Sequence, residues 1–125
     1  MSRDDEHAHQ VALFAWAESV RRQYPDLRWM HSVPNGGVRS PRTAGRMKAE
    51  GVRRGVVDVF LDVPKGGYHG LRIELKRPKG GSLTTEQREW IDGYRERGYR
   101  AEVCRGWDAA RELIVEYLTT PQEAT

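Results

Sequence analysis

The chain has 125 residues, of which 38% are hydrophobic and 31% are charged, and its formal net charge is only +3. This length suits one compact domain, and four Trp, five Tyr and two Phe residues supply enough apolar surface for a core, which excludes a disordered chain. The net charge alone selects no partner, so the distribution of charge along the chain is more informative.

Apolar periodicity predicts eight elements along the chain. Spacings of three and four predict helices at about 4–24, 41–50, 84–97 and 108–118. Alternation or short apolar runs predict strands at 27–33, 56–63, 68–77 and 99–104. This order predicts an α/β fold with a mixed sheet of about four strands flanked by helices. We expect a single domain over residues 1–125, with its core at about 6–118 and a frayed tail at 119–125.

Several helix ends carry recognisable signals. Asp4 or Asp5 can cap the first helix, and Pro25 is expected to end it. Thr84, followed three residues later by Gln87, has the spacing of a capping box at the start of the third helix.

Residue usage excludes several classes of protein and site. Cys104 is the only cysteine, so no intrachain disulfide forms, which is typical of a reducing, intracellular setting. The N-terminal stretch MSRDDEHAHQ lacks the apolar segment of a secretory signal, and no apolar run is long enough to span a bilayer. The histidines lack zinc-site spacing, and neither glycine pair has the sequence context of a P-loop, so we expect no nucleotide cofactor.

The second and third predicted strands are joined by the short segment 65–67, which predicts an antiparallel hairpin. The midpoint of positions 58 and 74 is 66, within that turn, so Asp58 and Glu74 are expected to face one another across the hairpin. Glu74 and Lys76 are two residues apart and therefore share one face of their strand, opposite an apolar face. Asp62 lies farther along the face of Asp58 and is assigned to the surface.

Two facing carboxylates repel one another unless a cation lies between them. A hard divalent cation suits Asp58 and Glu74, and the backbone carbonyl of Leu75 is a candidate third ligand. Mg²⁺ keeps several waters in such a site, one of which could serve as a nucleophile, and Mn²⁺ is expected to substitute for it. Lys76 could orient this water or stabilise charge on a phosphate, and could act as a base only if its pKa fell well below about 10.4.

Residues 39–54 contain six basic side chains against one acid, Glu50, and this local charge suggests a polyanionic partner. The Pro34-Asn-Gly-Gly37 turn could also bring backbone amides to DNA. Candidate DNA contacts are Asn35, Gly36, Arg39, Lys48, Arg53, Arg54, Arg77 and Lys79.

Separated motifs along the chain carry a resemblance to a known family. They are Glu6 with Gln10, Pro34-Asn-Gly-Gly-Val-Arg39, the approach from Gly51 to Asp58, Ile73-Glu-Leu-Lys76, the stretch from Gly80 to Gln87 with Trp90, and Gly98-Tyr99. In this order and spacing they resemble the VRR-NUC domains (virus-type replication-repair nucleases) of the PD-(D/E)xK superfamily. The resemblance covers about residues 6–118.

The resemblance implies a metal-dependent phosphodiesterase with a restriction-endonuclease-like core. It suggests Asp58, Glu74 and the Leu75 carbonyl as metal ligands, Lys76 at the nucleophilic water, Glu6 as an additional acid and further candidate ligand, and Gln87 as a helix residue that supports the site. The family commonly has Pro-Asp where this chain has Val57-Asp58. Proline stiffens the backbone and supplies no chemistry, so activity is expected to persist.

The expected function is Mg²⁺-dependent, structure-selective hydrolysis of DNA that leaves a 3′-hydroxyl and a 5′-phosphate, as the resemblance implies. A four-way (Holliday) junction is the first-choice substrate, because stand-alone members of this kind resemble junction-cleaving dimers and two symmetric sites suit two cuts. The alternatives are a non-catalytic DNA-binding module and a nicking or duplex endonuclease without junction preference. The expected location is cytoplasmic, for a bacterial or phage-encoded protein.

Each site assignment also has a plainer alternative. Glu74 and Lys76 could form an ordinary solvated ion pair, as isolated Glu-x-Lys pairs in strands usually do. Gln87 could serve only as a helix cap, and residues 34–37 only as a turn. The basic side chains could form only a solvated, positively charged face.

Overall fold

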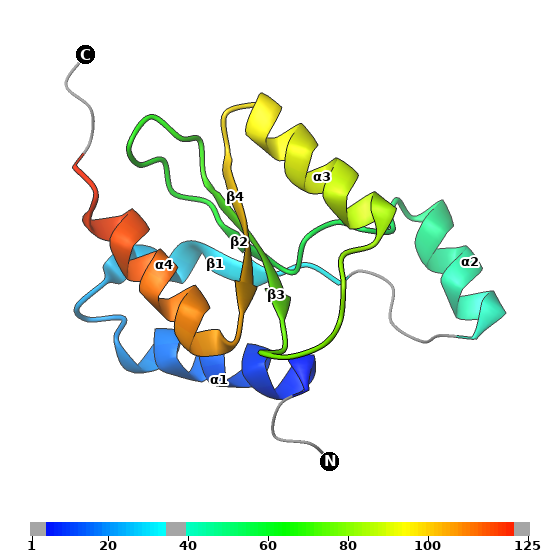
Figure 1. The fold of residues 1–125 in the computed structure, drawn as a ribbon, viewed down its shortest axis with the longest axis horizontal. Coiled ribbons are helices and arrows are strands. Elements are labelled where there is room, and N and C mark those ends of the chain that lie inside the picture. Colours follow the sequence, from blue (N-terminus) through cyan, green and yellow to red (C-terminus); the bar gives the residue numbers. More distant parts are fainter. Residues whose placement is uncertain (1–4, 35–39, 122–125) are drawn as a thin grey trace.

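The structure is a computed structural model that describes residues 5–34 and 40–121 (Figure 1). Its elements are α1 (Glu6–Ser19), the 3₁₀ helix η1 (Pro25–Trp29), β1 (Met30–Ser32), α2 (Pro41–Ala49), β2 (Val59–Leu61), β3 (Leu71–Lys76), α3 (Thr85–Glu96), β4 (Arg100–Arg105) and α4 (Trp107–Thr119). The predicted α/β class is confirmed, because one four-stranded mixed sheet is flanked by four α-helices.

The strands lie in the order β1-β2-β3-β4, with the first two pairs antiparallel and the last pair parallel. Val59 pairs with Ile73, which is the register predicted from the turn at residue 66. The hairpin and its register are therefore confirmed, although β2 is shorter than expected and begins just after Asp58.

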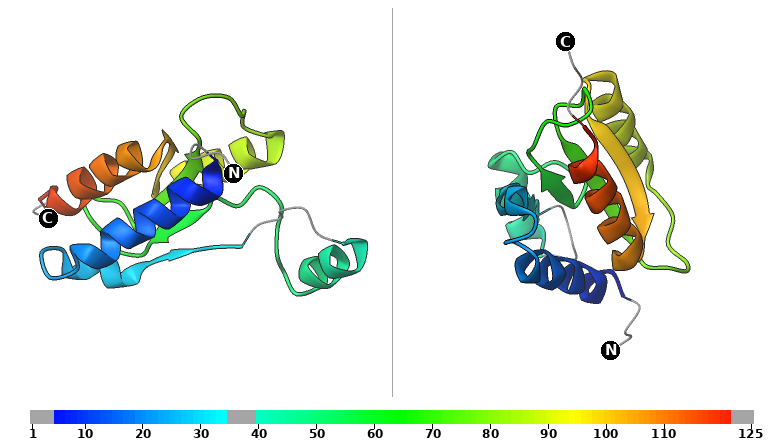
Figure 2. Two further views of the ribbon diagram at one scale, coloured as in Figure 1. Left: turned by 90° about the horizontal axis from the view of Figure 1, so that it is seen from below. Right: turned by 90° about the vertical axis from the view of Figure 1, so that its left-hand side faces the viewer.

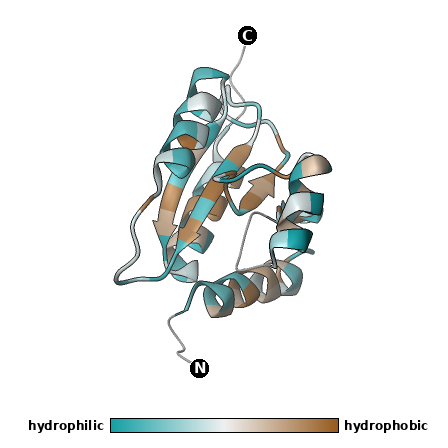
Figure 3. Ribbon diagram, turned by 90° about the vertical axis from the view of Figure 1, so that its right-hand side faces the viewer, coloured by the Kyte–Doolittle hydropathy of each residue, from teal (hydrophilic) through white to brown (hydrophobic). Residues whose placement is uncertain are grey.

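Helices cover both faces of the sheet (Figure 2). Residues of α1 and α4 pack with β2 and β3 in the larger core, which includes Leu13, Leu61, Ile73, Ile114 and Tyr117. On the other face, α3 packs over a smaller apolar cluster of Val57, Ile91 and Ala101, with partly buried residues around it. Colouring by hydropathy shows apolar residues concentrated on the strands between these layers (Figure 3).

Two predicted boundaries in the N-terminal part are wrong. The first helix ends at Ser19, earlier than the expected stop at Pro25, because the chain turns at residues 20–23. The strand expected over 27–33 is shorter, since Pro25 begins a 3₁₀ helix whose Leu27 is buried in the core and the strand starts only at Met30. The predicted cap is confirmed, with the Asp5 side chain accepting from the Ala8 N–H.

All six residues of β3 are buried, including the polar residues opposite its apolar face, so the alternative of an ordinary solvated strand face is wrong. Arg72, Glu74 and Lys76 are only 6%, 1% and 6% exposed. Their face of the sheet is the one covered by α3, which contacts the sheet through β4. Burial of three charged side chains requires a partner for each of them.

Arg72 finds its partners in a cage of rings and one carboxylate. Its guanidinium carbon lies 3.9 Å from the ring centroid of Phe60, 4.4 Å from that of Tyr99 and 5.4 Å from that of Tyr94. Its Nη1 donates to Asp62 Oδ1 at 3.0 Å. Asp62, predicted to be an ordinary surface residue, thus neutralises a buried cation while its own side chain is half exposed.

We predict that Arg72→Ala lowers the free energy of unfolding by about 3 kcal/mol, because it removes a desolvated cation from its ring cage and leaves a void. Chemical denaturation followed by circular dichroism measures the change. Arg28→Ala is the matched control, since Arg28 also lies over a ring, that of Trp29, but at an exposed site. Equal losses in the two variants would contradict the account of Arg72.

Candidate active site

Asp58 reaches the sheet along a tightly packed approach. Gly55 has a φ of +90°, and a Cβ added to it would lie 2.6 Å from the carbonyl carbon of Glu86 in the first turn of α3. The indole Nε1 of Trp90 donates to the backbone carbonyl of Arg54 at 3.1 Å. Gly55 allows the chain to pass close to α3, and this hydrogen bond holds it there. Asp58 is therefore positioned just before β2.

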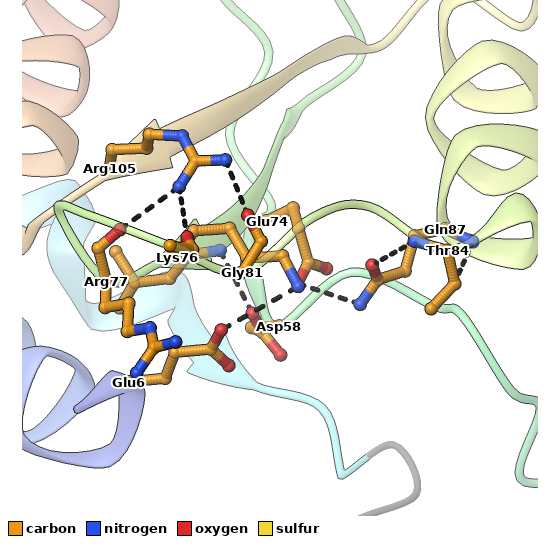
Figure 4. A network of polar contacts seen from close by, with 11 residues as sticks. Glu6, Asp58, Glu74, Lys76, Arg77, Gly81, Thr84, Gln87 and Arg105 are labelled. Atoms are coloured by element: carbon orange, nitrogen blue, oxygen red, sulfur yellow. Dashed lines mark hydrogen bonds and ion pairs between the residues drawn. The ribbon is translucent and has the colours of Figure 1, made fainter.

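Glu74 lies opposite Asp58 and is the most deeply buried acid of the site, with 1% of its surface exposed. Its Oε2 accepts from Gln87 Nε2 at 3.2 Å and lies 3.7 Å from Lys76 Nζ (Figure 4). Its Oε1 is buried and has no hydrogen-bond partner among the described residues. One oxygen of Glu74 is therefore held in place while the other is left without a donor.

Lys76 links the strand to the first helix. Its side chain is 7% exposed, and its Nζ lies 3.8 Å from Oε1 of Glu6 as well as 3.7 Å from Glu74. Glu6 is half exposed in the first turn of α1. The surface ion pair considered for Glu74 and Lys76 is therefore wrong, because the pair is buried.

Gln87 combines the two roles that its sequence position left open. Its Oε1 accepts from the Thr84 N–H at 2.9 Å, and Thr84 Oγ1 accepts from the Gln87 N–H at 3.1 Å, which completes the predicted capping box. Its amide nitrogen remains available and donates to Glu74. The cap thus fixes the orientation of the donor that holds Glu74.

The backbone of Leu75 lies between the two acids. Its N–H donates to Asp58 Oδ2 at 3.0 Å. The N–H and C=O of a strand residue point toward the same neighbouring strand, so the Leu75 carbonyl is directed to the side on which Asp58 lies. The carboxylates of Asp58 and Glu74 and the carbonyl of Leu75 therefore lie at the open end of the hairpin, away from its turn.

Burial, next the negative charge of Asp58 and then a side-chain hydrogen bond with Asp58 raise the pKa of Glu74 from 4.5 to about 9. Lys76 opposes this shift, and its effect is smaller. Without a cation, Glu74 therefore holds a proton at neutral pH. A divalent cation would displace that proton, because it binds the ionised carboxylate.

No group of three or more His, Cys, Asp or Glu side chains within residues 5–34 and 40–121 could hold a metal ion. The donor set here is two carboxylates and a carbonyl, which fits Mg²⁺ because this ion binds through one or two carboxylates and keeps several waters. The partnerless Oε1 of Glu74 is the observation that favours such a cation. A structural zinc site, in which four protein side chains surround the ion, does not fit this donor set.

The predicted DNA contacts fall into three groups. Arg77 and Lys79 are exposed on the loop between β3 and α3, beside the site. Lys48, Arg53 and Arg54 are exposed on α2 and the segment after it, where α2 extends from the body with no buried residue (Figure 1). Three further candidates lie outside the described residues, namely Asn35, Gly36 and Arg39.

Comparisons with known proteins identify a family and a similar fold. A model described as the VRR-NUC domain matches residues 4–108. A solved structure described as a "VRR_NUC domain protein" is 28% identical, with a TM-score of 0.81 over 98% of this chain and 94% of that chain. No curated protein is similar enough to match. Among the described residues, no helix is long and apolar enough to cross a membrane.

We predict that the metal-free chain loses stability as the pH rises from about 4.5 to about 9. The folded state keeps the Glu74 proton over this range, whereas the unfolded chain releases it near 4.5, so the stabilisation is complete at low pH and lost toward pH 9. Thermal melts in EDTA measure the effect. Glu74→Gln, which mimics the protonated side chain, should show a flatter profile, and identical pH profiles for both proteins would contradict the assignment.

Proposed function

The chain belongs to the VRR-NUC domain family, a family of nucleases, and from this premise we propose that it is a Mg²⁺-dependent, structure-selective DNA endonuclease. The observation that carries the proposal is the buried Glu74, with one oxygen held by Gln87 and Lys76 and the other without a partner, facing Asp58. We propose one nuclease domain over residues 1–125, with this site at the end of the β2–β3 hairpin.

In the proposed reaction, Asp58, Glu74 and the Leu75 carbonyl hold the cation, and Glu6 is a further candidate ligand. When bound, the cation lowers the pKa of a coordinated water and offsets negative charge on the phosphate. Mn²⁺ is expected to replace Mg²⁺, because it also binds carboxylate and carbonyl oxygens.

Lys76 acts on the attacking water or on the phosphate. Its buried Nζ lies 3.8 Å from Glu6 Oε1 and 3.7 Å from Glu74 Oε2, and these two contacts keep it positioned. A positioned cation stabilises negative charge that builds up on a phosphate oxygen in the transition state. We therefore assign Lys76 an electrostatic and orienting role in preference to that of a general base.

The DNA backbone is proposed to contact exposed basic residues of the loop beside the site and of α2 with the segment after it. Those residues are Arg77 and Lys79 on the loop after β3, and Lys48, Arg53 and Arg54 on and after α2, with Asn35, Gly36 and Arg39 as further candidates. A set of phosphate contacts binds a duplex without reading its sequence, which is compatible with recognition of DNA shape.

A four-way junction cut by a homodimer is the proposed substrate and assembly. One small chain offers limited surface for branched DNA, and two symmetry-related sites would make paired cuts. A nicking or duplex endonuclease without junction preference is the alternative enzyme. A non-catalytic DNA-binding module is the alternative outside enzymes, with the Glu6, Lys76 and Glu74 ion pairs then purely structural.

We predict that purified protein with Mg²⁺ cuts labelled junction DNA faster than flap or linear duplex, and that EDTA stops the reaction. Glu74→Ala should reduce the rate at least about 100-fold, because it removes a metal ligand, and Lys76→Ala about 100-fold, because it removes a transition-state charge. Gel analysis of the products measures these rates and maps the cuts.

The matched controls are Glu102→Ala and Lys65→Ala. Glu102 is a carboxylate on the neighbouring strand that pairs with Arg95, and Lys65 lies at the far turn of the hairpin. Both variants should keep near wild-type rates. Equal cutting by wild type and Glu74→Ala would reject the site, and DNA binding without any cutting would favour the non-catalytic module.

Two variants distinguish the capping role of Gln87 from its contact with Glu74. Thr84→Ala should lower the free energy of unfolding by about 1 kcal/mol through loss of the cap, with kcat unchanged. Gln87→Ala should lose similar stability and also lower kcat about tenfold, because Glu74 loses its donor. Denaturation and saturating kinetics together measure both, and equal kcat values for the two variants would contradict the second role.

A further inference from the structure

The loop from Arg77 to Leu83 joins the strand that carries Glu74 and Lys76 to the helix that carries Gln87. It borders the site, since a Cβ added to Gly81 would lie 3.9 Å from Oε1 of Glu6. It also carries Arg77 and Lys79, both exposed, as its two basic side chains. The position of this loop therefore decides where two candidate phosphate contacts lie.

Arg105, at the end of β4, holds the loop through its guanidinium. Its Nη1 donates to the Gly80 carbonyl at 2.7 Å and to the Arg77 carbonyl at 3.4 Å. Its Nη2 donates to the Gly81 carbonyl at 3.0 Å (Figure 4). Three main-chain oxygens of one loop thus accept from one side chain located more than twenty residues away along the chain.

Few other interactions hold the loop. Within the part of the chain that the structure describes, the backbone N–H groups of residues 79–82 donate to no acceptor. Gly80 and Gly81 both have positive φ, at +79° and +68°, a conformation in which glycine is the least strained residue. A segment with two glycines and few hydrogen bonds of its own depends on Arg105 to keep one shape.

The geometry also explains why the residue is an arginine. A planar guanidinium presents donors in two directions and reaches carbonyls on both sides of a turn, whereas a lysine ammonium is a single point. Arg105 pairs with Lys76 in the β3–β4 register, so the strand that carries the site and the side chain that holds the loop are joined in one ladder.

We propose that Arg105 is a positioning residue that sets the Arg77–Leu83 loop so that Arg77 and Lys79 meet the DNA backbone beside the scissile phosphate. This assignment rests on the proposed nuclease function. Arg105 acts through the loop carbonyls and makes no contact of its own with the reacting atoms. Its loss therefore weakens binding of the substrate in the ground state and the transition state alike, which raises KM and leaves kcat unchanged.

The test compares full-length wild type, Arg105→Ala and Arg105→Lys with junction DNA and Mg²⁺. Arg105→Ala should raise KM about tenfold with kcat within about twofold, and Arg105→Lys should give an intermediate KM. Arg97→Ala is the matched control, because Arg97 is an exposed arginine that also donates to a main-chain carbonyl, that of Gly93, far from the loop. Its KM should equal that of wild type.

Trypsin gives a second measurement that needs no DNA. The bond after Arg77 precedes proline and resists trypsin, so Lys79–Gly80 is the cleavable bond of the loop. Arg105→Ala should be cut there faster than wild type and Arg97→Ala, as mass spectrometry of the fragments would detect, while the melting temperature stays close to that of wild type. Either an unchanged KM or unchanged cleavage at this bond overturns the assignment.

A double-mutant cycle separates the loop from a direct contact. In a chain that already carries Arg77→Ala and Lys79→Ala, removal of Arg105 should change KM less than about twofold. A full tenfold rise in that background overturns the positioning role, because Arg105 would then bind DNA itself. A wild-type chain that cuts no DNA overturns the proposed function, whereas an active enzyme with normal KM after Arg105→Ala overturns only this inference.

Discussion

The burial of Glu74 is the constraint on which the site depends. A carboxyl group with 1% exposure has lost its hydration, and Gln87 and Lys76 replace that hydration on one oxygen only. The charge of Asp58 adds repulsion, so the metal-free group holds a proton. The same burial that makes ionisation of Glu74 unfavourable also favours a bound cation. A cation between the two acids would offset their repulsion and take the place of the proton.

The alternation of β3 supplies both the core and the site. One set of alternate residues packs into the larger core with α1 and α4, and the other set points to the face covered by α3. On that second face, Arg72 lies among aromatic rings, and Glu74 and Lys76 form an ion pair farther along the strand. A single buried strand thus holds the catalytic candidates rigidly, because its other residues are fixed by apolar packing and by the Asp62 pair.

The hairpin register and the capping box were predictable from the sequence because both are local. A short turn and a two-residue period leave one register that buries the apolar face, and Thr84 and Gln87 have the spacing that the cap requires. The burial of Arg72 and Lys76 was not predictable, because it depends on where α3 and distant rings pack. The contact of Arg105 with Gly80 and Gly81 is missed for the same reason, since only the parallel β3–β4 pairing brings those segments together.

The central claim is that Asp58 and Glu74 share one divalent cation, and anomalous scattering from crystals soaked in Mn²⁺ tests it most directly. The account predicts one strong peak between the two carboxylates, at about 2.2 Å from their oxygens and next to the Leu75 carbonyl, and no such peak in Glu74→Gln. A peak bound elsewhere, or none at this position in well-ordered wild-type crystals, would contradict it.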